Sequence, residues 1–180
     1  MARNIEIKAR IPSVEALLPR ARALADGDAA LIEQDDTFFP VPHGRLKLRE
    51  FADGSAELIH YERPDTGAAK ASDYVRVAAL EPAVLREALA RGLGLLGRVR
   101  KQRWLLLAGA TRIHLDRVQG LGDFMELEVV LAPGQSDAEG AAIAETLMQA
   151  LGLGQAPRLA GAYLDLLRET AAVGSVLALD

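Results

Sequence analysis

The chain of 180 residues has the length of one ordinary domain, and its 50% hydrophobic and 26% charged residues are typical of a soluble protein with a substantial core. A formal net charge of −4 gives no sign of a nucleic-acid-binding surface, and the absence of cysteine excludes disulfides and thiolate metal sites. Neither a signal peptide nor an apolar run of roughly 18 residues is visible. We therefore expect one cytoplasmic domain over residues 1–180, without nucleic-acid or membrane partners.

The first half of the chain mixes alternating and helical patterns. Residues 2–11, "ARNIEIKARI", predict a strand, because apolar or small residues alternate with polar ones. The spacing of apolar residues in "PSVEALLPRARALAD" predicts a helix that ends at Asp26-Gly27. Further strands are predicted over 31–39, 45–51, 56–63 and 72–80, and a helix near 82–93.

The second half predicts three more strands, over 98–107, 110–118 and 124–131. A capping box at "SDAE", residues 136–139, opens a helix that Gly152 closes, and a last helix contains "AYLDLL". The tail "TAAVGSVLALD" carries no prediction. Eight strands joined by many short turns favour an antiparallel sheet, and a sheet of this size can close into a narrow barrel. The predicted fold class is therefore α+β.

The predicted strands share a charged face. Lys47 and Arg49 alternate with leucines, as do the charged residues at 112–116 and at 126–128, whereas the cations of 98–107 do not segregate to one side. Of the adjacent Asp35 and Asp36, at most one can share the charged face. On a single strand such a face usually meets solvent. If the sheet closes and amphipathic helices cover its apolar side, the charged faces must instead point inward.

An inward lining of this kind has a specific chemistry. Buried cations and carboxylates must be hydrated, paired or bound to a ligand. Several cations hold a polyanion, and arginine can bind phosphate oxygens through two hydrogen bonds. Convergent carboxylates hold Mg²⁺ or Mn²⁺. Glu6, Glu126 and Glu128 lie on strands that could meet across one end of such a tunnel.

In this order, these segments resemble the CYTH family of triphosphate tunnel metalloenzymes, which includes class IV adenylyl cyclases and thiamine triphosphatases. The family's hallmark is an N-terminal E-x-E-x-K strand, to which "NIEIK" contributes Asn4, Glu6 and Lys8. The resemblance runs from about residue 3 to residue 168 and includes "QDDTFF", "RLKLR", "RKQR", "IHLDRVQGLGDFMELE" and "GAYLDLL".

The resemblance implies an eight-stranded antiparallel tunnel that binds a triphosphate and Mg²⁺ or Mn²⁺. It implies metal binding by Glu6, Glu126 and Glu128, and catalytic roles for Lys8 and Asp116, of which Asp116 would stand at the metal or orient a water. The cations implied to bind phosphate are Lys8, Arg10, Lys47, Arg49, Arg63, Arg76, Lys101, Arg103 and Arg112.

Asn4 stands where the hallmark has its first glutamate. An amide oxygen can bind a hard cation but brings no charge, so this change weakens the metal site, alters its stoichiometry or marks a subgroup with different chemistry. His114 is interpreted as a paired structural histidine, and Tyr163 as a packing residue.

Three functions agree with the sequence. The first is a metal-dependent triphosphatase that hydrolyses inorganic or small organic triphosphate. The second is a class IV adenylyl cyclase that converts ATP into cyclic AMP and pyrophosphate. The third is a non-catalytic binder of triphosphate or polyphosphate, for which Asn4 is the best support. A homodimer is compatible with the sequence, which carries no signal for one.

Overall fold

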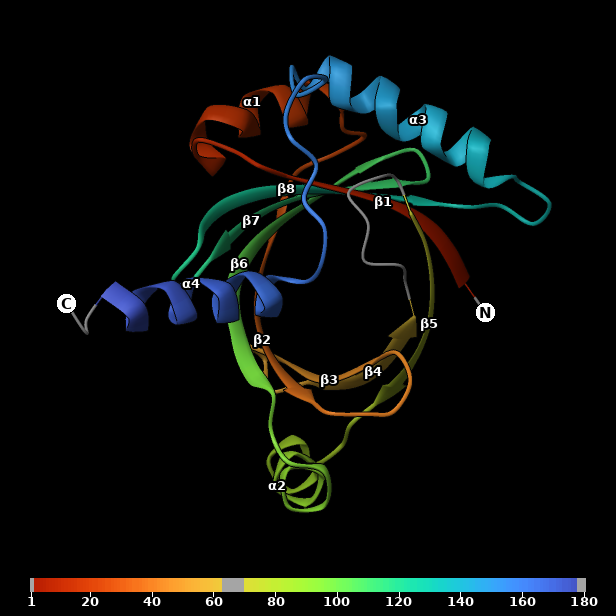
Figure 1. Cartoon of the computed structure of the whole chain (residues 1–180). Coiled ribbons are helices and arrows are strands. Elements are labelled where there is room, and N and C mark those ends of the chain that lie inside the picture. Colours follow the sequence, from red (N-terminus) through yellow and green to blue (C-terminus); the bar gives the residue numbers. More distant parts are fainter. Residues whose placement is uncertain (1, 63–69, 178–180) are drawn as a thin grey trace.

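The fold is a closed antiparallel β-barrel, seen along its axis in Figure 1. The computed structural model describes residues 2–62 and 70–177. Its strands follow the order β1-β5-β4-β3-β2-β6-β7-β8, and every neighbouring pair is antiparallel. The strands are β1 (Ala2–Arg10), β2 (Ala30–Phe39), β3 (Arg45–Phe51), β4 (Ala56–Glu62), β5 (Lys70–Ala78), β6 (Gly97–Ala108), β7 (Thr111–Val118) and β8 (Gly122–Val130). The predicted eight-stranded α+β barrel is confirmed.

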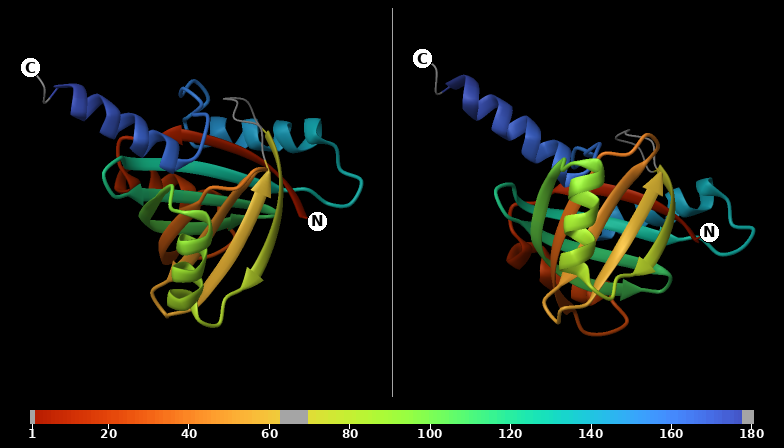
Figure 2. Two further views of the ribbon diagram at one scale, coloured as in Figure 1. Left: turned by 60° about the horizontal axis from the view of Figure 1, so that its bottom comes forward. Right: turned by 90° about the horizontal axis from the view of Figure 1, so that it is seen from below.

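Four helices lie outside the barrel: α1 (Val14–Leu24), α2 (Pro82–Leu93), α3 (Asp137–Ala150) and α4 (Tyr163–Leu177). Helices α1 and α3 pack over β1, β7 and β8, and α2 lies on the opposite side (Figure 1). The predicted capping box of Ser136 and Glu139 opens α3. Helix α4 starts beside the barrel and extends away from it (Figure 2), so it includes much of the tail that the sequence left unassigned. Within the described residues, no helix has the length and apolar character that crossing a membrane requires.

The largest hydrophobic core lies between the barrel wall and the helices, and not inside the barrel. It is built from the apolar positions of four strands and from one stripe each of α1 and α3. The buried members are Ile5, Ile7, Ala9, Ile11, Val14, Leu17, Ala21, Leu106, Ile113, Leu115, Met125, Leu127, Val129, Ala144, Met148 and Leu151. Since side chains alternate along a strand, the polar positions between these residues point into the barrel.

Strand β6 resolves the pattern that the sequence left ambiguous. Arg98 and Arg100 lie outside the barrel, where their Nε atoms are 2.6 and 3.0 Å from the carboxylate oxygens of Asp35. Lys101 and Arg103 point inward and are buried. The cations of this strand therefore do segregate to two faces, and its charged inner face matches those of its neighbours.

Candidate active site

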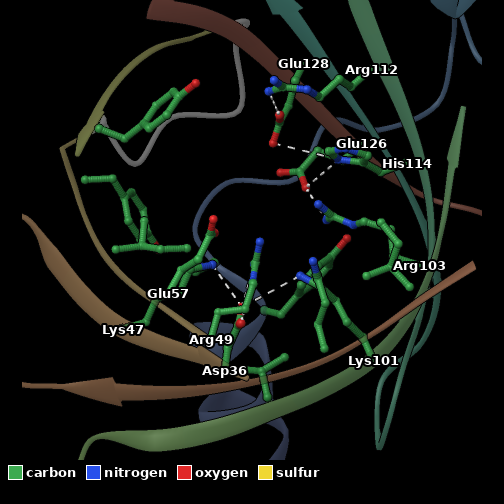
Figure 3. Close-up of a pocket in the computed structure, with 18 of the residues that line it drawn as sticks. Asp36, Lys47, Arg49, Glu57, Lys101, Arg103, Arg112, His114, Glu126 and Glu128 are labelled. Carbon is green, nitrogen blue, oxygen red and sulfur yellow. Dashed lines mark hydrogen bonds and ion pairs between the residues drawn. The ribbon is translucent and has the colours of Figure 1, made fainter. Parts of the chain in front are cut away.

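The barrel encloses a cavity of about 320 Å³ with a charged lining (Figure 3). Seven cationic side chains and five carboxylates are contributed by all eight strands, so the cavity suits an anionic ligand together with a cation. The cations are Lys8, Lys47, Arg49, Arg76, Lys101, Arg103 and Arg112, and the carboxylates are Glu6, Asp36, Glu57, Glu126 and Glu128.

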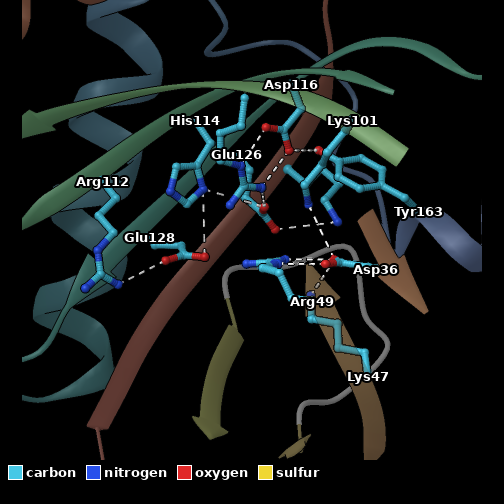
Figure 4. Close-up of polar contacts among 12 residues, drawn as sticks. Asp36, Lys47, Arg49, Lys101, Arg112, His114, Asp116, Glu126, Glu128 and Tyr163 are labelled. Carbon is cyan, nitrogen blue, oxygen red and sulfur yellow. Dashed lines mark hydrogen bonds and ion pairs between the residues drawn. The ribbon is translucent and has the colours of Figure 1, made fainter. Parts of the chain in front are cut away.

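One side of the cavity, which we call the basic wall, consists of Lys47, Arg49 and Lys101 around the carboxylate of Asp36 (Figure 4). Arg49 binds both oxygens of Asp36 at 2.7 and 2.8 Å, and Lys47 Nζ lies 2.9 Å from Oδ2. Lys101 Nζ lies 3.9 Å from the same oxygen. The register of β2 and β3 places Asp36 directly opposite Arg49, which explains the two-point contact.

The basic wall has three cations for one carboxylate, and burying these charges carries a desolvation cost. Burial would raise the pKa of Asp36, but Arg49 and Lys47 outweigh burial and hold it well below its usual value. Burial lowers the pKa of Lys47 to about 8, with Arg49 adding to this effect. Burial and Arg103 also hold the pKa of Lys101 well below its usual value. An anion bound here would stabilise the charged form of both lysines.

The opposite side, which we call the acidic wall, contains Glu126, Glu128 and His114 (Figures 3 and 4), and strand register adds Glu6, which also lines the cavity. Strand register brings them together, because Glu6 faces Glu128 across β1 and β8, and His114 faces Glu126 across β7 and β8. Ligand atoms of His114, Glu126 and Glu128 lie within 4.8 Å of one another. Among the described residues, these three form the group of side chains that is close enough together to hold a metal ion.

Three cavity-lining residues of the described part of the chain each have a buried polar atom without a hydrogen bond to any described group: Asn4 Oδ1, Gln34 Oε1 and His114 Nδ1. Carboxylate and amide oxygens are ligands that Mg²⁺ and Mn²⁺ accept. The acidic wall therefore has the kinds of ligand atom that a divalent cation accepts, and those of His114, Glu126 and Glu128 lie close together.

Arg103 connects the two walls. Its guanidinium binds both oxygens of Asp116 at 2.6 Å and one oxygen of Glu126 at 3.0 Å. Asp116 also accepts a hydrogen bond of 2.9 Å from the Tyr163 hydroxyl. Burial would raise the pKa of Asp116, but Arg103 and Lys101 lower it to about 2, so the carboxylate stays ionised. This network fixes the direction in which Arg103 points.

Lys8 lies between the acidic wall and the start of α4. Its Nζ atom is 3.5 Å from Glu126 Oε1 and 4.3 Å from the centre of the Tyr163 ring, and it donates to the Gly161 carbonyl at 3.3 Å. The Leu159 amide donates to the Lys8 carbonyl, which ties the segment before α4 to β1. The lysine of the "NIEIK" strand is therefore held at the cavity by a segment far away in sequence.

Of the described residues implied to form the site, all but two line this one cavity. Arg10 lies beyond the end of the cavity on β1 and is therefore exposed. Its guanidinium lies 4.6 Å from the centre of the Phe124 ring and donates a hydrogen bond to the Leu121 carbonyl. Asp116 is fully buried behind Arg103 and is not part of the lining, so the structure does not place it at a metal or a water. Arg63 lies outside the described residues.

The sequence missed three residues of the site. Asp36 was indistinguishable from Asp35 until strand register was known. His114 was interpreted as structural, but it lines the acidic wall; Tyr163 packs on Phe124 as expected and in addition contacts both Asp116 and Lys8. For His114 a signal was present, since it shares its face with Arg112 and Asp116.

The CYTH domain model matches residues 2–163, so the chain belongs to the CYTH family, whose members are triphosphatases or adenylyl cyclases. The comparison with curated protein sequences gave no significant match.

Solved structures share the fold over nearly the whole chain. A protein from Pyrococcus horikoshii OT3 is 24% identical with a TM-score of 0.81, covering 91% of this chain and 99% of its own. A Vibrio parahaemolyticus protein, provisionally named an adenylate cyclase, is 19% identical with a TM-score of 0.77, covering 92% and 97%. A Hippeastrum protein, provisionally named an adenylyl cyclase and said to have a dominant triphosphatase activity, is 16% identical with a TM-score of 0.67, covering 94% and 96%.

Proposed function

We propose that this protein is a divalent-metal-dependent triphosphatase that hydrolyses inorganic tripolyphosphate or a small organic triphosphate inside the barrel. The observation that carries the proposal is the arrangement of two walls of opposite charge across one cavity. A triphosphate needs several cations for its oxygens, and a metal-bound triphosphate also needs carboxylates to hold the metal. The cavity contains both sets, facing each other.

The basic wall is the proposed phosphate-binding surface. Arg49, Lys47 and Lys101 surround one carboxylate, so three cations share a single negative charge. Arg49 already presents its planar guanidinium in a fixed orientation, which reduces the loss of side-chain freedom when an anion binds. Arg103 is the proposed contact at the centre of the cavity, and Asp116 and Tyr163 act as its positioning residues.

The acidic wall is the proposed metal site, with Glu6, Glu126 and Glu128 holding Mg²⁺ or Mn²⁺. When bound, such an ion neutralises charge on phosphate oxygens and activates a water for attack. Lys8 is the proposed catalytic cation, because it is buried next to Glu126 and close to the metal-binding carboxylates. It would stabilise the negative charge that moves onto the leaving phosphate oxygen.

The test is a turnover assay of the purified protein with tripolyphosphate, ATP and thiamine triphosphate, each with Mg²⁺ or Mn²⁺. Phosphate, pyrophosphate and cyclic AMP are followed separately, with Lys8→Ala as the variant and Arg98→Ala, outside the barrel, as the control. Phosphate release that Lys8→Ala abolishes supports the proposal. Cyclic AMP with pyrophosphate would identify a class IV adenylyl cyclase instead. Triphosphate binding without turnover under every condition would identify a non-catalytic binder.

A further inference from the structure

His114 is a buried nitrogen donor in the acidic wall that the proposed carboxylate site does not use. The residue is 3% exposed, and its Nδ1 atom makes no hydrogen bond to any described group. The same atom lies 3.8 Å from Glu126 Oε2 and 3.8 Å from Glu128 Oε1. One nitrogen thus lies equally far from an oxygen of each carboxylate.

These distances do not fit a histidine held by hydrogen bonds. Such bonds join heavy atoms at about 2.7–3.2 Å, so neither carboxylate is a hydrogen-bond partner of Nδ1. Two atoms that each lie about 2.1 Å from one metal ion can be up to about 4.2 Å apart. Separations of 3.8 Å therefore suit two ligands of the same ion.

A second, independent observation points to a ligand at the same place. Asn4 Oδ1 is also buried, also without a hydrogen bond to any described group, and lines the same cavity. Buried polar atoms are nearly always paired in folded proteins, so the unpaired atoms of one charged cavity, among them also Gln34 Oε1, indicate a bound group that satisfies them. The Asn4 amide oxygen is an acceptor, and His114 Nδ1, which lies near Glu126 and Glu128, is an acceptor when the ring proton is on Nε2; in that tautomer both atoms suit a cation.

We propose that His114 Nδ1 is a direct ligand of the metal, together with Glu126 and Glu128, and that the site selects a first-row transition-metal ion over Mg²⁺. This inference rests on the proposed metal-dependent function. Mg²⁺ strongly prefers oxygen ligands, whereas imidazole suits the transition metals. Replacing one oxygen ligand by nitrogen therefore disfavours Mg²⁺. Asn4 also disfavours Mg²⁺, because its neutral amide stands where the family hallmark has a charged glutamate, and a hard cation depends on such a charge.

The experiment measures metal binding and not activity. Mn²⁺ is titrated into the purified full-length protein, and pulsed electron paramagnetic resonance then detects nitrogen nuclei coupled to the bound ion. The expected result is a ¹⁴N coupling that changes to ¹⁵N when the protein is produced with ¹⁵N-histidine. His114→Asn, which replaces the imidazole by an amide, should remove the coupling and weaken Mn²⁺ binding at least about 10-fold. Mg²⁺ binding should change far less, so the Mn²⁺/Mg²⁺ selectivity falls.

His43→Asn is the matched control, since His43 is exposed and is not part of the cavity lining; it should leave the coupling intact.

If His114→Asn fails to fold, the double variant His43→Asn/His60→Asn decides, because the chain has three histidines and a retained coupling then belongs to His114. Tight Mn²⁺ binding without nitrogen coupling, or a coupling that survives in His114→Asn, would overturn the inference while leaving the proposed function in place. Failure to bind either Mn²⁺ or Mg²⁺ would overturn both.

Discussion

The basic and acidic walls differ in how completely their charges are paired within the protein. On the basic wall, Arg49 and Lys47 occupy both oxygens of Asp36 at 2.7–2.9 Å. On the acidic wall, Arg103 holds Glu126 at 3.0 Å, but Glu128 has looser contacts, 3.3 Å to Arg112 and 3.8 Å to His114. The basic wall thus has its own counterion in Asp36, whereas Glu128 and His114 on the acidic wall are arranged as ligands of a cation would be.

Because of this difference, one side of the cavity suits an anion and the opposite side suits a metal ion. A preorganised set of cations binds an anion without first having to be assembled, while the loose pairing of Glu128 near His114 Nδ1 lowers the cost of admitting a metal. A metal-bound triphosphate would therefore enter with its phosphates toward β3 and β6 and its metal toward β8. The following variants separate the contributions of the two walls.

The largest expected effect is on stability and comes from the residue between the walls. Arg103→Ala leaves the fully buried Asp116 without its main partner, and breaking a buried pair in this way costs about 3–5 kcal/mol. Urea unfolding at neutral pH measures this loss in the free energy of unfolding.

Arg100→Ala is the control for that measurement, since Arg100 lies on the same strand but pairs with Asp35 outside the barrel. An exposed pair contributes at most about 1 kcal/mol, so this variant should remain close to wild type. Equal losses in the two variants would show that burial of the network does not determine its contribution.

The next effect is on catalysis and tests the acidic wall. Glu128→Gln keeps the shape of the side chain but removes a charge from the proposed metal site, so we expect turnover to fall roughly 100-fold or more. Triphosphate binding without metal should change little, because the basic wall is intact. Isothermal titration and the turnover assay measure the two quantities.

Glu33→Gln is the matched control, because Glu33 is exposed and pairs with Gln102 outside the barrel. If Glu128→Gln has the turnover of wild type, Glu128 is not part of the metal site.

The sequence predicted the barrel and most of its lining because both follow from alternation. Once a strand has one apolar face, its charged residues must point the other way, and "NIEIK" and "RLKLR" carry that pattern plainly. Residues that depend on pairing between distant strands were not predictable in the same way. Asp36 and Asp35 alternate sides, and the register with β3 determines which one meets Arg49.

The position of Tyr163 illustrates a second limit. It opens α4 but contacts Lys8, near the other end of the chain, through a segment whose Leu159 bonds to β1. Such contacts depend on tertiary folding, and the local periodicity of a sequence does not predict them. Conversely, Arg10 has the correct alternation but lies beyond the cavity, because alternation determines the face of a residue and not its depth along the barrel.

A smaller effect, on affinity, tests the basic wall. Arg49→Ala removes the side chain that we expect to bind phosphate oxygens through two hydrogen bonds, and charge-assisted bonds of this kind contribute about 1.5–3 kcal/mol. The dissociation constant for tripolyphosphate should therefore rise at least about 10-fold, with or without metal. Arg98→Ala, outside the barrel, should leave it unchanged. An unchanged affinity in Arg49→Ala would contradict the assignment of the basic wall.

The smallest effect is a pH dependence that belongs to the basic wall alone. Burial lowers the pKa of Lys47 to about 8, so in the free protein this side chain is cationic below that pH and neutral above it. Triphosphate affinity measured without metal should therefore fall by about 1 kcal/mol, roughly fivefold, as the pH rises from 7 to 9. Lys47→Arg keeps its charge across this range and should flatten the profile. A decrease of the same size in Lys47→Arg would assign the titration to another group, and Lys101, whose pKa burial also lowers, would then be the residue to replace next.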